Sequence, residues 1–309
     1  NPAWKKTPAD LETQDYKDFY RELYPATFDE PLFHIHLNVD YPFNLTGILY
    51  FPKLKNNIQV QKNKIQLYSN QVFITDSVEN IVPEFLTLLH GVIDSPDIPL
   101  NVSRSYLQED AAVRKISGHI TKKVADKLAS MFKNDRKDFE AKWDDIKVFI
   151  EYGMLTEEKF FDKMKKAFLF KNVDGEHFTI DEYKEKIQEN QKDKNDQVVH
   201  LYASDVKDQD NFIESAKNRG YDVLLLETPL TGHFIQHLES KLENVKFTRV
   251  DGDTVDKLIE KDEQPESNLT DEQKKTIEPV IEDVAGKDKF TVRFESMTEN
   301  DDPMVITRP

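Results

Sequence analysis

The stretch "QVVHLYASDVKDQDNFIESAKNRGYDVLLLET", Gln197–Thr228, decides the fold. It begins with the apolar segment "QVVHLYAS", continues with "VKDQDNFIESAKNRG", which has the spacing of a helix ending at Gly220, and closes with the continuous apolar segment "YDVLLLET". Strands that alternate with helices of about 10–15 residues indicate parallel β-α-β units, and strands without polar alternation are typically buried on both faces. We therefore predict a parallel sheet covered by helices on both sides.

The segments on either side extend this pattern into two layered domains. Downstream, "LTGHFIQHLESKL" predicts a helix and "VKFTRVD" a third strand, which completes a small three-layer α/β domain at residues 196–252. Upstream, residues 1–130 predict a larger α/β domain. Its expected elements are a helix at Asp10–Leu23, a hairpin at Leu32–Leu54, one or two strands at Lys64–Asp76, and a short buried helix followed by an extended run from Val82.

Two further regions complete the predicted organisation. Residues 131–195 are expected to form a helical connector between the two domains. Residues 253–309 contain, near their start, "DKLIEKDEQPESNLTDEQKK", which has too few apolar residues to offset the entropy of ordering and is interpreted as an acidic linker. The segment "KFTVRFESM" then predicts a strand. The fold class is therefore α/β, with two α-β-α layered domains joined by a helical connector.

The composition excludes several kinds of site and partner. The 309-residue chain has no cysteine, so it can form neither a disulfide framework nor a thiolate zinc site or thiol nucleophile. Its formal charge of -16 argues against nucleic acid as a partner, because Lys and Arg must neutralise phosphates in such complexes. No apolar run approaches the roughly 20 residues that span a bilayer, so we expect no membrane partner.

The sequence lacks the motifs of a self-contained active site. Only nine glycines occur, and there is no P-loop, dinucleotide-binding glycine pattern or G-x-S-x-G elbow. The pair His34 and His36 would place two imidazoles on the same face of a strand, as some metal sites do, but no third ligand accompanies them. We therefore predict no metal site.

The motif "NVDGEHFTIDEY", Asn172–Tyr183, imitates a calcium-binding loop. With Gly175 as the sixth loop position, Phe170 stands where the first carboxylate belongs and Asp181 where a bidentate Glu is expected. The motif fails at both ends. A β-turn followed by a helix capped at Thr179 or Asp181 explains it better.

The remaining candidate is Arg104 in "PLNVSRSYLQ", which stands at the start of a long predicted helix, Tyr106–Asp135. A cation is disfavoured at a helix start by a few tenths of a kcal/mol, because the free N–H groups there carry partial positive charge. In one interpretation Arg104 meets a phosphate delivered by another domain, and the helix start and the guanidinium then bind the anion together.

The alternative interpretation is purely structural. Asn101, Ser103 or Ser105 would cap the helix, Ser105 and Gln108 would form a capping box, and Arg104 would point into water. The residues alone leave both interpretations open.

A resemblance to a known family favours the first interpretation. The block "DSPDIPLNVSRSYLQED" resembles the "DS-DLPLNVSRE-LQ" block of the heat-shock-protein-90 chaperones, particularly their bacterial HtpG type. Other blocks resemble the middle domain of that family and the start of its C-terminal domain in the same order. They are "NPAWKKTPADLETQDYKDFYREL", "IQLYSNQVFITD", "YKEKIQENQ", "VVHLYASD", "RGYDVLLLETPL" and "FTVRFESMTENDDPMVITRP".

The resemblance implies an ATP-driven, stress-response molecular chaperone whose ATP site lies in a separate N-terminal domain. Matched residue by residue, Arg104 would contact the γ-phosphate of ATP, while Asn101 and Gln108 would support the loop. Trp4 matches a tryptophan for which client contact has been proposed, although packing onto the first helix is the simpler interpretation. By itself, this chain is not expected to hydrolyse ATP.

The same resemblance implies the cofactor and the partners. ATP with Mg²⁺ would be bound mainly by the N-terminal domain, and no cofactor is expected on this chain alone. The expected partners are the protein's own N-terminal ATPase and C-terminal dimerisation domains, unfolded or partly folded client proteins, and a second copy in a homodimer. The expected compartment is the bacterial cytoplasm.

Two other functions fit some of the same features. In the first, the chain is a non-catalytic interaction scaffold and the Arg104 loop binds an acidic protein segment. In the second, it is the transducer domain of a topoisomerase-type or mismatch-repair-type ATPase, which reaches ATP typically through a lysine. The DNA-binding work of the second class would favour a basic groove, which the charge of -16 argues against.

Overall fold

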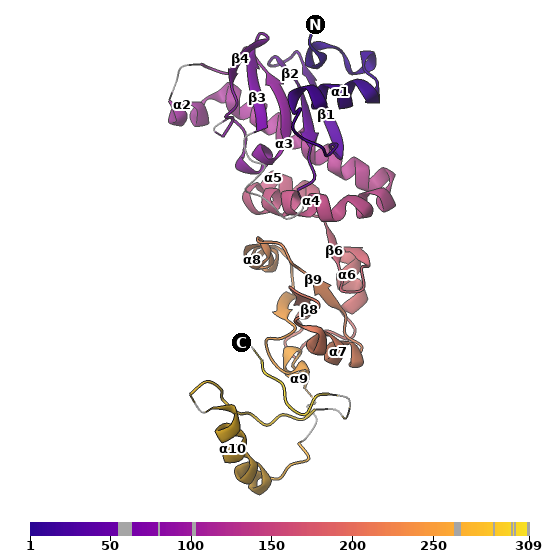
Figure 1. Cartoon of the computed structure of the whole chain (residues 1–309), viewed down its shortest axis with the longest axis vertical. Helices are drawn as coiled ribbons and strands as arrows, with labels where there is room; N and C mark the ends of the chain where they lie inside the picture. The colour runs from indigo at the N-terminus through magenta and orange to yellow at the C-terminus, as the bar shows by residue number, and fades with distance from the viewer. Residues whose placement is uncertain are drawn as a thin grey trace. The chain divides into compact units, whose positions relative to one another are not determined.

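The fold is known from a computed structural model that describes residues 1–54, 64–79, 81–100, 103–262, 267–286, 288–297, 299 and 301–307. The chain forms two compact units. The first consists of Asn1–Leu169 with Thr228–Phe234, and the second of Phe170–Glu227 with Ile235–Pro309. Both units combine helices with a β-sheet (Figure 1), so the predicted α/β class is confirmed.

The first unit is built on a five-stranded sheet in the order β1-β2-β5-β3-β4. The predicted hairpin is present, because β1 and β2 pair antiparallel from Phe33↔Phe51 to Val39↔Leu45. β5 then lies in the middle of the sheet, antiparallel to β2 and parallel to β3. The strands are β1 (Phe33–Val39), β2 (Leu45–Phe51), β3 (Lys64–Ser69), β4 (Val72–Thr75) and β5 (His90–Asp94).

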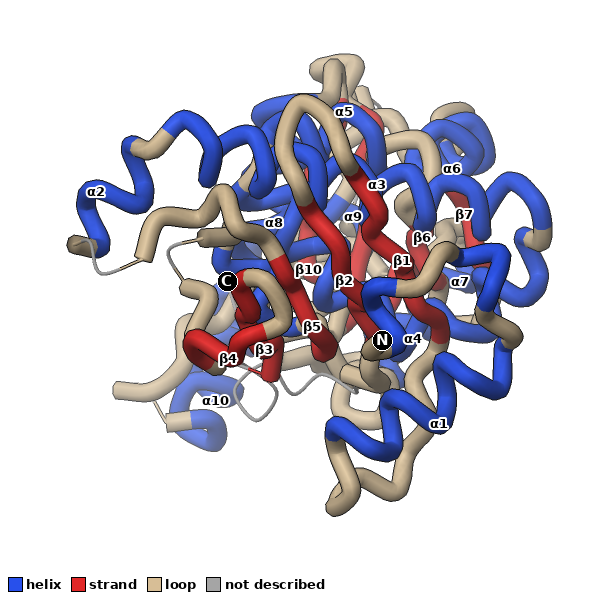
Figure 2. The backbone as a smooth tube through the Cα atoms, turned by 90° about the horizontal axis from the view of Figure 1, so that it is seen from above, coloured by secondary structure: helices blue, strands red, loops and turns tan. Residues whose placement is uncertain are grey.

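Helices cover both faces of this sheet, with α1 on one side and α3 on the other (Figure 2). Alternate residues of β2 point to opposite faces, as the strand geometry requires. Ile48 and Tyr50 pack against α1 and the 3-10 helix η1, whereas Phe51 contacts Phe149 of α4 at 4.6 Å between ring centroids. The elements are η1 (Ala3–Lys5), η2 (Pro8–Asp10), α1 (Thr13–Leu23), η3 (Glu84–Leu88), α3 (Ala111–Asn134), α4 (Arg136–Thr156) and α5 (Glu158–Met164).

The first unit extends beyond the domain boundary expected at residue 130. Helices α4 and α5, which the sequence suggested as part of a connector, cluster with this unit up to Leu169. The physical reason is their aromatic content, since Phe149 and Phe160 both pack on Phe85 of η3. The division of the chain into four functional regions stays a prediction.

A buried carboxyl holds a distant piece of chain in the first unit. Glu151 of α4 is 4% exposed and accepts a hydrogen bond from Thr228 Oγ1 at 2.5 Å. Burial raises the pKa of Glu151 to about 7, because a low-dielectric environment disfavours the carboxylate, while the Thr228 hydrogen bond and the charge of Lys147 act in the opposite direction.

This raised pKa predicts a pH-dependent stability of the first unit. Between pH 4.5 and pH 7 folded Glu151 binds more protons than unfolded Glu151, so the free energy of unfolding falls as the pH rises, by up to about 3 kcal/mol. We expect Glu151→Gln, which cannot ionise, to raise the urea midpoint at pH 8 and to change it less at pH 5. Both tryptophans, Trp4 and Trp143, lie in the first unit, so tryptophan fluorescence measures its unfolding.

Glu158→Gln provides the matched control for Glu151→Gln, because Glu158 is an exposed glutamate in the same unit. It should retain the pH dependence of the parent chain. If Glu151→Gln and Glu158→Gln gave the same slope of stability against pH, Glu151 would not be the titrating group.

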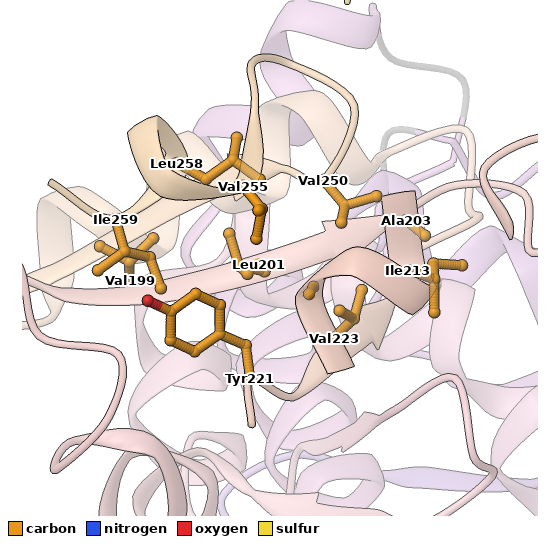
Figure 3. Close-up of a cluster of buried hydrophobic side chains, with 11 residues drawn as sticks. Val199, Leu201, Ala203, Ile213, Tyr221, Val223, Val250, Val255, Leu258 and Ile259 are labelled. Atoms are coloured by element: carbon orange, nitrogen blue, oxygen red, sulfur yellow. The ribbon is translucent and has the colours of Figure 1, made fainter. Parts of the chain in front are cut away.

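The second unit contains the predicted parallel sheet, in the order β10-β8-β9. Its elements are β8 (Val198–Ala203), α7 (Asp210–Asn218), β9 (Val223–Leu225), β10 (Val245–Arg249), α9 (Val255–Leu258) and the part of α8 (Thr231–Lys241) from Ile235 onward. One face of the sheet carries an apolar core in which Leu201 and Val223 meet Ile213 of α7 and Val255 of α9 (Figure 3).

The opposite face of the sheet carries α6 (Ile180–Ile187), which begins at a capping box of Thr179 and Glu182. Of the two helix caps considered for the calcium-like motif, the structure has Thr179. The residues Tyr183, Ile187 and Gln191 recur every fourth position and are all buried. The Gln191 side chain joins β8 to the residue just before β9, because its Nε2 donates to Val199 O at 2.9 Å and its Oε1 accepts from Asp222 N–H at 2.6 Å.

Two predictions for residues 253–309 need correction. The acidic stretch does not begin as a free linker, because Val255, Leu258 and Ile259 are buried in the core of the second unit and α10 (Asp271–Ala285) follows. The strand expected in "KFTVRFESM" is absent from the described residues 289–297. The alternating pattern is there, but a strand also needs a hydrogen-bonded partner, and no described segment pairs with it.

Among the described helices, none is long and apolar enough to cross a membrane.

Candidate functional site

The loop that carries Arg104 starts from the middle of the first sheet, where β5 ends at Asp94. Its first residues are fixed by hydrogen bonds to the β1–β2 turn. Ser95 Oγ donates to Asn44 O at 2.6 Å, and Asn44 N–H donates to Asp97 Oδ2 at 2.6 Å. Ile98 is 2% exposed and packs inside the unit. The root of the loop is therefore rigidly positioned.

The loop ends at α2 (Arg104–Glu109), so Arg104 is the first residue of a helix. Ser103 is the N-cap, and its Oγ accepts a hydrogen bond from Tyr106 N–H at 3.3 Å. Of the three capping residues considered, the structure uses Ser103. Ser105 lies within the helix, so Ser103 and not Ser105 occupies the N-cap position. Asn101 lies outside the described residues, as do the side chains of Arg104, Ser105 and Gln108.

The single long helix predicted after this loop is interrupted at Asp110. The Asp110 carboxylate accepts hydrogen bonds from Ala112 N–H at 2.8 Å and Val113 N–H at 3.0 Å, and so caps a new helix, α3. Side-chain capping of this kind competes with a continuous helix. Because α2 has only six residues, its dipole is small.

At the end of β5, the buried carboxylate of Asp94 contacts two other segments of the first unit. Its Oδ2 accepts hydrogen bonds from Trp4 Nε1 at 3.0 Å and from Gln71 N–H at 3.1 Å, and it lies 3.4 Å from Lys5 Nζ. The Asp94 side chain is fully buried. Asp94 thus holds the N-terminal segment and the β3–β4 turn at the strand end from which the Arg104 loop departs.

Trp4 is part of this packing. The side chain is 8% exposed, and its ring lies 5.7 Å from Phe19 of α1 and 5.0 Å from Tyr68 between centroids. The expected packing onto the first helix is therefore present. Client contact through Trp4 stays a prediction, and it would require the ring to leave its hydrogen bond with Asp94.

Exposed apolar side chains flank the position of Arg104. Leu100 is 40% exposed and Tyr106 is 53% exposed. On the edge strand β4, Val72 and Phe73 are 63% and 52% exposed. Burying such side chains under another protein or domain would be energetically favourable. A cavity of about 810 Å³ in the same unit is lined by α3, α5 and the residues around Pro83, and not by the Arg104 loop.

The histidine pair lies where the strand pattern placed it. His34 and His36 share one face of β1, where Tyr16 of α1 stacks on His34 and its hydroxyl pairs with His36 Nδ1 at 2.8 Å. Burial lowers the pKa of His34 to about 4, with a further contribution from the charge of Lys127. Over the described part of the chain, no group of three or more His, Asp or Glu side chains is placed to hold a metal ion.

Comparison with known proteins identifies the family of the chain. The family model described as "Hsp90 protein" matches residues 1–308. The chain belongs to the Hsp90 family. The assignment made from the "DSPDIPLNVSRSYLQED" block and its neighbours is thereby confirmed.

Individual Hsp90 relatives match along the whole chain. The chaperone protein HtpG of Porphyromonas gingivalis (strain ATCC 33277) is 57% identical over 311 residues, which is 100% of this chain and 45% of the relative. The chaperone protein HtpG of Bacteroides fragilis (strain 638R) is 55% identical over 99% of this chain and 45% of the relative. The chain thus spans less than half the length of these curated Hsp90 relatives.

A solved structure shows the same fold. The middle domain of a heat shock protein of Plasmodium falciparum superposes with a TM-score of 0.62 at 23% sequence identity, covering 81% of this chain and 99% of that chain. At this identity the likeness concerns the fold alone.

Proposed function

We propose that this chain is the middle segment of an ATP-dependent molecular chaperone, and that Arg104 contacts the γ-phosphate of ATP held by a separate N-terminal domain. The observation that carries the proposal is the position of Arg104. It is the first residue of α2, at the end of a loop rooted on the central strand β5 of an Hsp90-type domain. ATP with Mg²⁺ would be bound by the N-terminal domain, and this chain would supply one cation.

The chemistry of the guanidinium suits this role. It stays charged at all physiological pH values and presents N–H donors in a planar fork that matches two phosphate oxygens. A cation placed at the γ-phosphate stabilises the negative charge that develops during phosphoryl transfer. Gln108 follows Arg104 by four residues and so lies on the same side of α2, which fits a supporting role for it, and Asn101 would support the loop from the other end.

The exposed apolar side chains beside Arg104 fit the docking of that domain. Leu100 and Tyr106 would be covered when the N-terminal domain delivers ATP, and their burial would contribute to the stability of the docked state. In this proposal the chain alone does not hydrolyse ATP appreciably, because the group that positions the attacking water belongs to the other domain. The full protein would be a homodimer in the bacterial cytoplasm that binds unfolded or partly folded clients.

The proposal is tested by mixing this chain with the separately produced ATP-binding domain of the same protein. We expect association that requires ATP and Mg²⁺, measured by analytical ultracentrifugation, and weaker association for Arg104→Ala. Arg114→Ala is the matched control, because Arg114 is an exposed arginine on the neighbouring helix α3. Association of equal strength with and without ATP would instead support the interaction-scaffold alternative.

A further inference from the structure

Arg219, at the end of α7 in the second unit, binds two carboxylates at once. Its Nε and Nη2 donate to Oδ1 and Oδ2 of Asp256 at 2.8 and 2.9 Å. Its Nη1 and Nη2 donate to Oδ1 and Oδ2 of Asp301 at 3.2 and 2.9 Å. Both carboxylates are therefore held in the two-point geometry that a guanidinium favours, and the position of each is tightly defined.

These three side chains come from distant parts of the sequence. Asp256 belongs to α9, close to the sheet, whereas Asp301 follows α10 and lies 82 residues after Arg219. The side chain of Arg219 is 11% exposed and that of Asp301 is 1% exposed. Charged groups this deeply buried are retained in a fold only when they are paired, so the contact between Arg219 and Asp301 cannot be treated as an incidental surface ion pair.

Two more contacts attach the same part of the chain to the same place. Ser215 lies one turn before Arg219 on α7, and its Oγ donates to Asp301 Oδ1 at 3.0 Å. Lys257, the neighbour of Asp256 on α9, pairs with Glu295. Two acidic side chains of the chain that follows α10, Asp301 and Glu295, thus meet two basic side chains, Arg219 at the end of α7 and Lys257 on α9.

The arrangement of charges makes Arg219 the key residue. Asp256 and Asp301 share a single guanidinium, so the three groups carry a net charge of about -1 between them. Without Arg219 the two carboxylates would repel each other in a largely buried place. Asp256, which belongs to α9, would stay with that helix. The chain that carries Asp301 would then be released. Without Asp301, by contrast, Arg219 keeps a two-point partner in Asp256, and the small domain remains paired.

We propose that the face of α7 and α9 formed by Ser215, Arg219, Asp256 and Lys257 is a docking site for the chain that follows α10, with Asp301 as the side chain that it recognises. Arg219 holds Asp301 in this site through hydrogen bonds to both of its carboxylate oxygens. While Asp301 is bound, the chain after α10 is fixed on the small α/β domain, and a displacement of either one is transmitted to the other. When the contact opens, the two move independently.

The test measures the distance between α7 and the docked chain. The absence of cysteine allows two spin labels to be attached specifically, at Glu214→Cys on the exposed side of α7 and at Met304→Cys, where the native side chain is 71% exposed. Double electron–electron resonance should give one narrow distance distribution in this background. We expect Arg219→Ala and Asp301→Ala each to broaden it by at least about twofold, because the buried pairing is lost.

Lys217→Ala is the matched control. Lys217 lies on the same helix and pairs with Asp174 at 2.6 Å in an exposed contact that does not involve the docked chain, so its removal should leave the distribution narrow. Circular dichroism verifies the fold of each variant. If Arg219→Ala unfolds the small domain, the distance distribution of Asp301→Ala alone tests the docking site. A distribution that stays narrow in Asp301→Ala, or that is already broad before any charge is removed, would overturn the proposal.

Discussion

Arg104→Ala should lower ATP turnover on the order of 100-fold in the protein that contains both this chain and its ATP-binding domain, and should leave ATP binding nearly unchanged. The reason is that Arg104 would act on charge that develops at the γ-phosphate during the reaction, whereas the nucleotide itself is held by the other domain. The measurements are steady-state ATP hydrolysis and the equilibrium affinity for ATP. An interaction that is made only in the transition state lowers kcat without weakening ground-state binding.

Arg114→Ala is again the appropriate control for Arg104→Ala, since it removes the same charge from an exposed position on α3. Its turnover should equal that of the parent protein. Unchanged turnover in Arg104→Ala would remove the proposed role of the arginine. A fall in turnover that only follows a loss of ATP affinity would mean that the substitution had disturbed folding or nucleotide binding.

Gly91→Ala should destabilise the first unit by at least about 4 kcal/mol, which is among the larger effects of single substitutions. Gly91 lies in β5, between β2 and β3, and its φ of +127° is one that residues with a Cβ rarely adopt. A Cβ built there would lie 2.0 Å from Ile48 O, a backbone atom of the neighbouring strand. The two strands would have to separate, and the hydrogen bond from Gly91 N–H to Tyr24 Oη at 2.7 Å would be strained.

Gly118→Ala provides the opposite case in the same unit. Gly118 lies inside α3, and a Cβ there would meet no atom within 4 Å, so alanine should stabilise the helix by about 0.5–1 kcal/mol. Urea unfolding followed by tryptophan fluorescence compares the two variants. If the free energy of unfolding of Gly91→Ala were within about 1 kcal/mol of that of the parent, β2 and β5 would not approach each other as closely as described.

The sequence predicted those parts of the fold that local patterns determine. The parallel strands around "VLLL", the hairpin of β1 and β2 and the cap at Thr179 follow from periodicity and capping residues within a few positions. The interruption at Asp110 was missed because apolar spacing continues across it, although an aspartate before an apolar helical run is a capping signal. The assignment of α4 to the first unit depends on contacts between distant rings, such as Phe149 with Phe51, which no local pattern contains.

In the candidate site, too, the local pattern was predicted from the sequence and the contacts between distant residues were not. Arg104 was found because a cation at a helix start is unusual and because its loop resembles a family block. The role of Asp94 as the common anchor of Trp4, Lys5 and Gln71 was not predicted, since these residues are far apart in sequence. The only available signal was an acidic residue at the end of an apolar strand. Likewise, nothing in the sequence around Arg219 indicates that its second partner is Asp301.

The placement of Thr228–Phe234 in the first unit has a consequence for dividing this chain into pieces. Neither unit is a continuous stretch of sequence, so no single cut yields two complete folding units. A piece that ends at Leu169 would leave the buried carboxyl of Glu151 without the Thr228 hydroxyl and the ring of Phe168 without Phe234, which lies 5.0 Å away. During synthesis the first unit is therefore expected to be completed only after β9 of the second has been made.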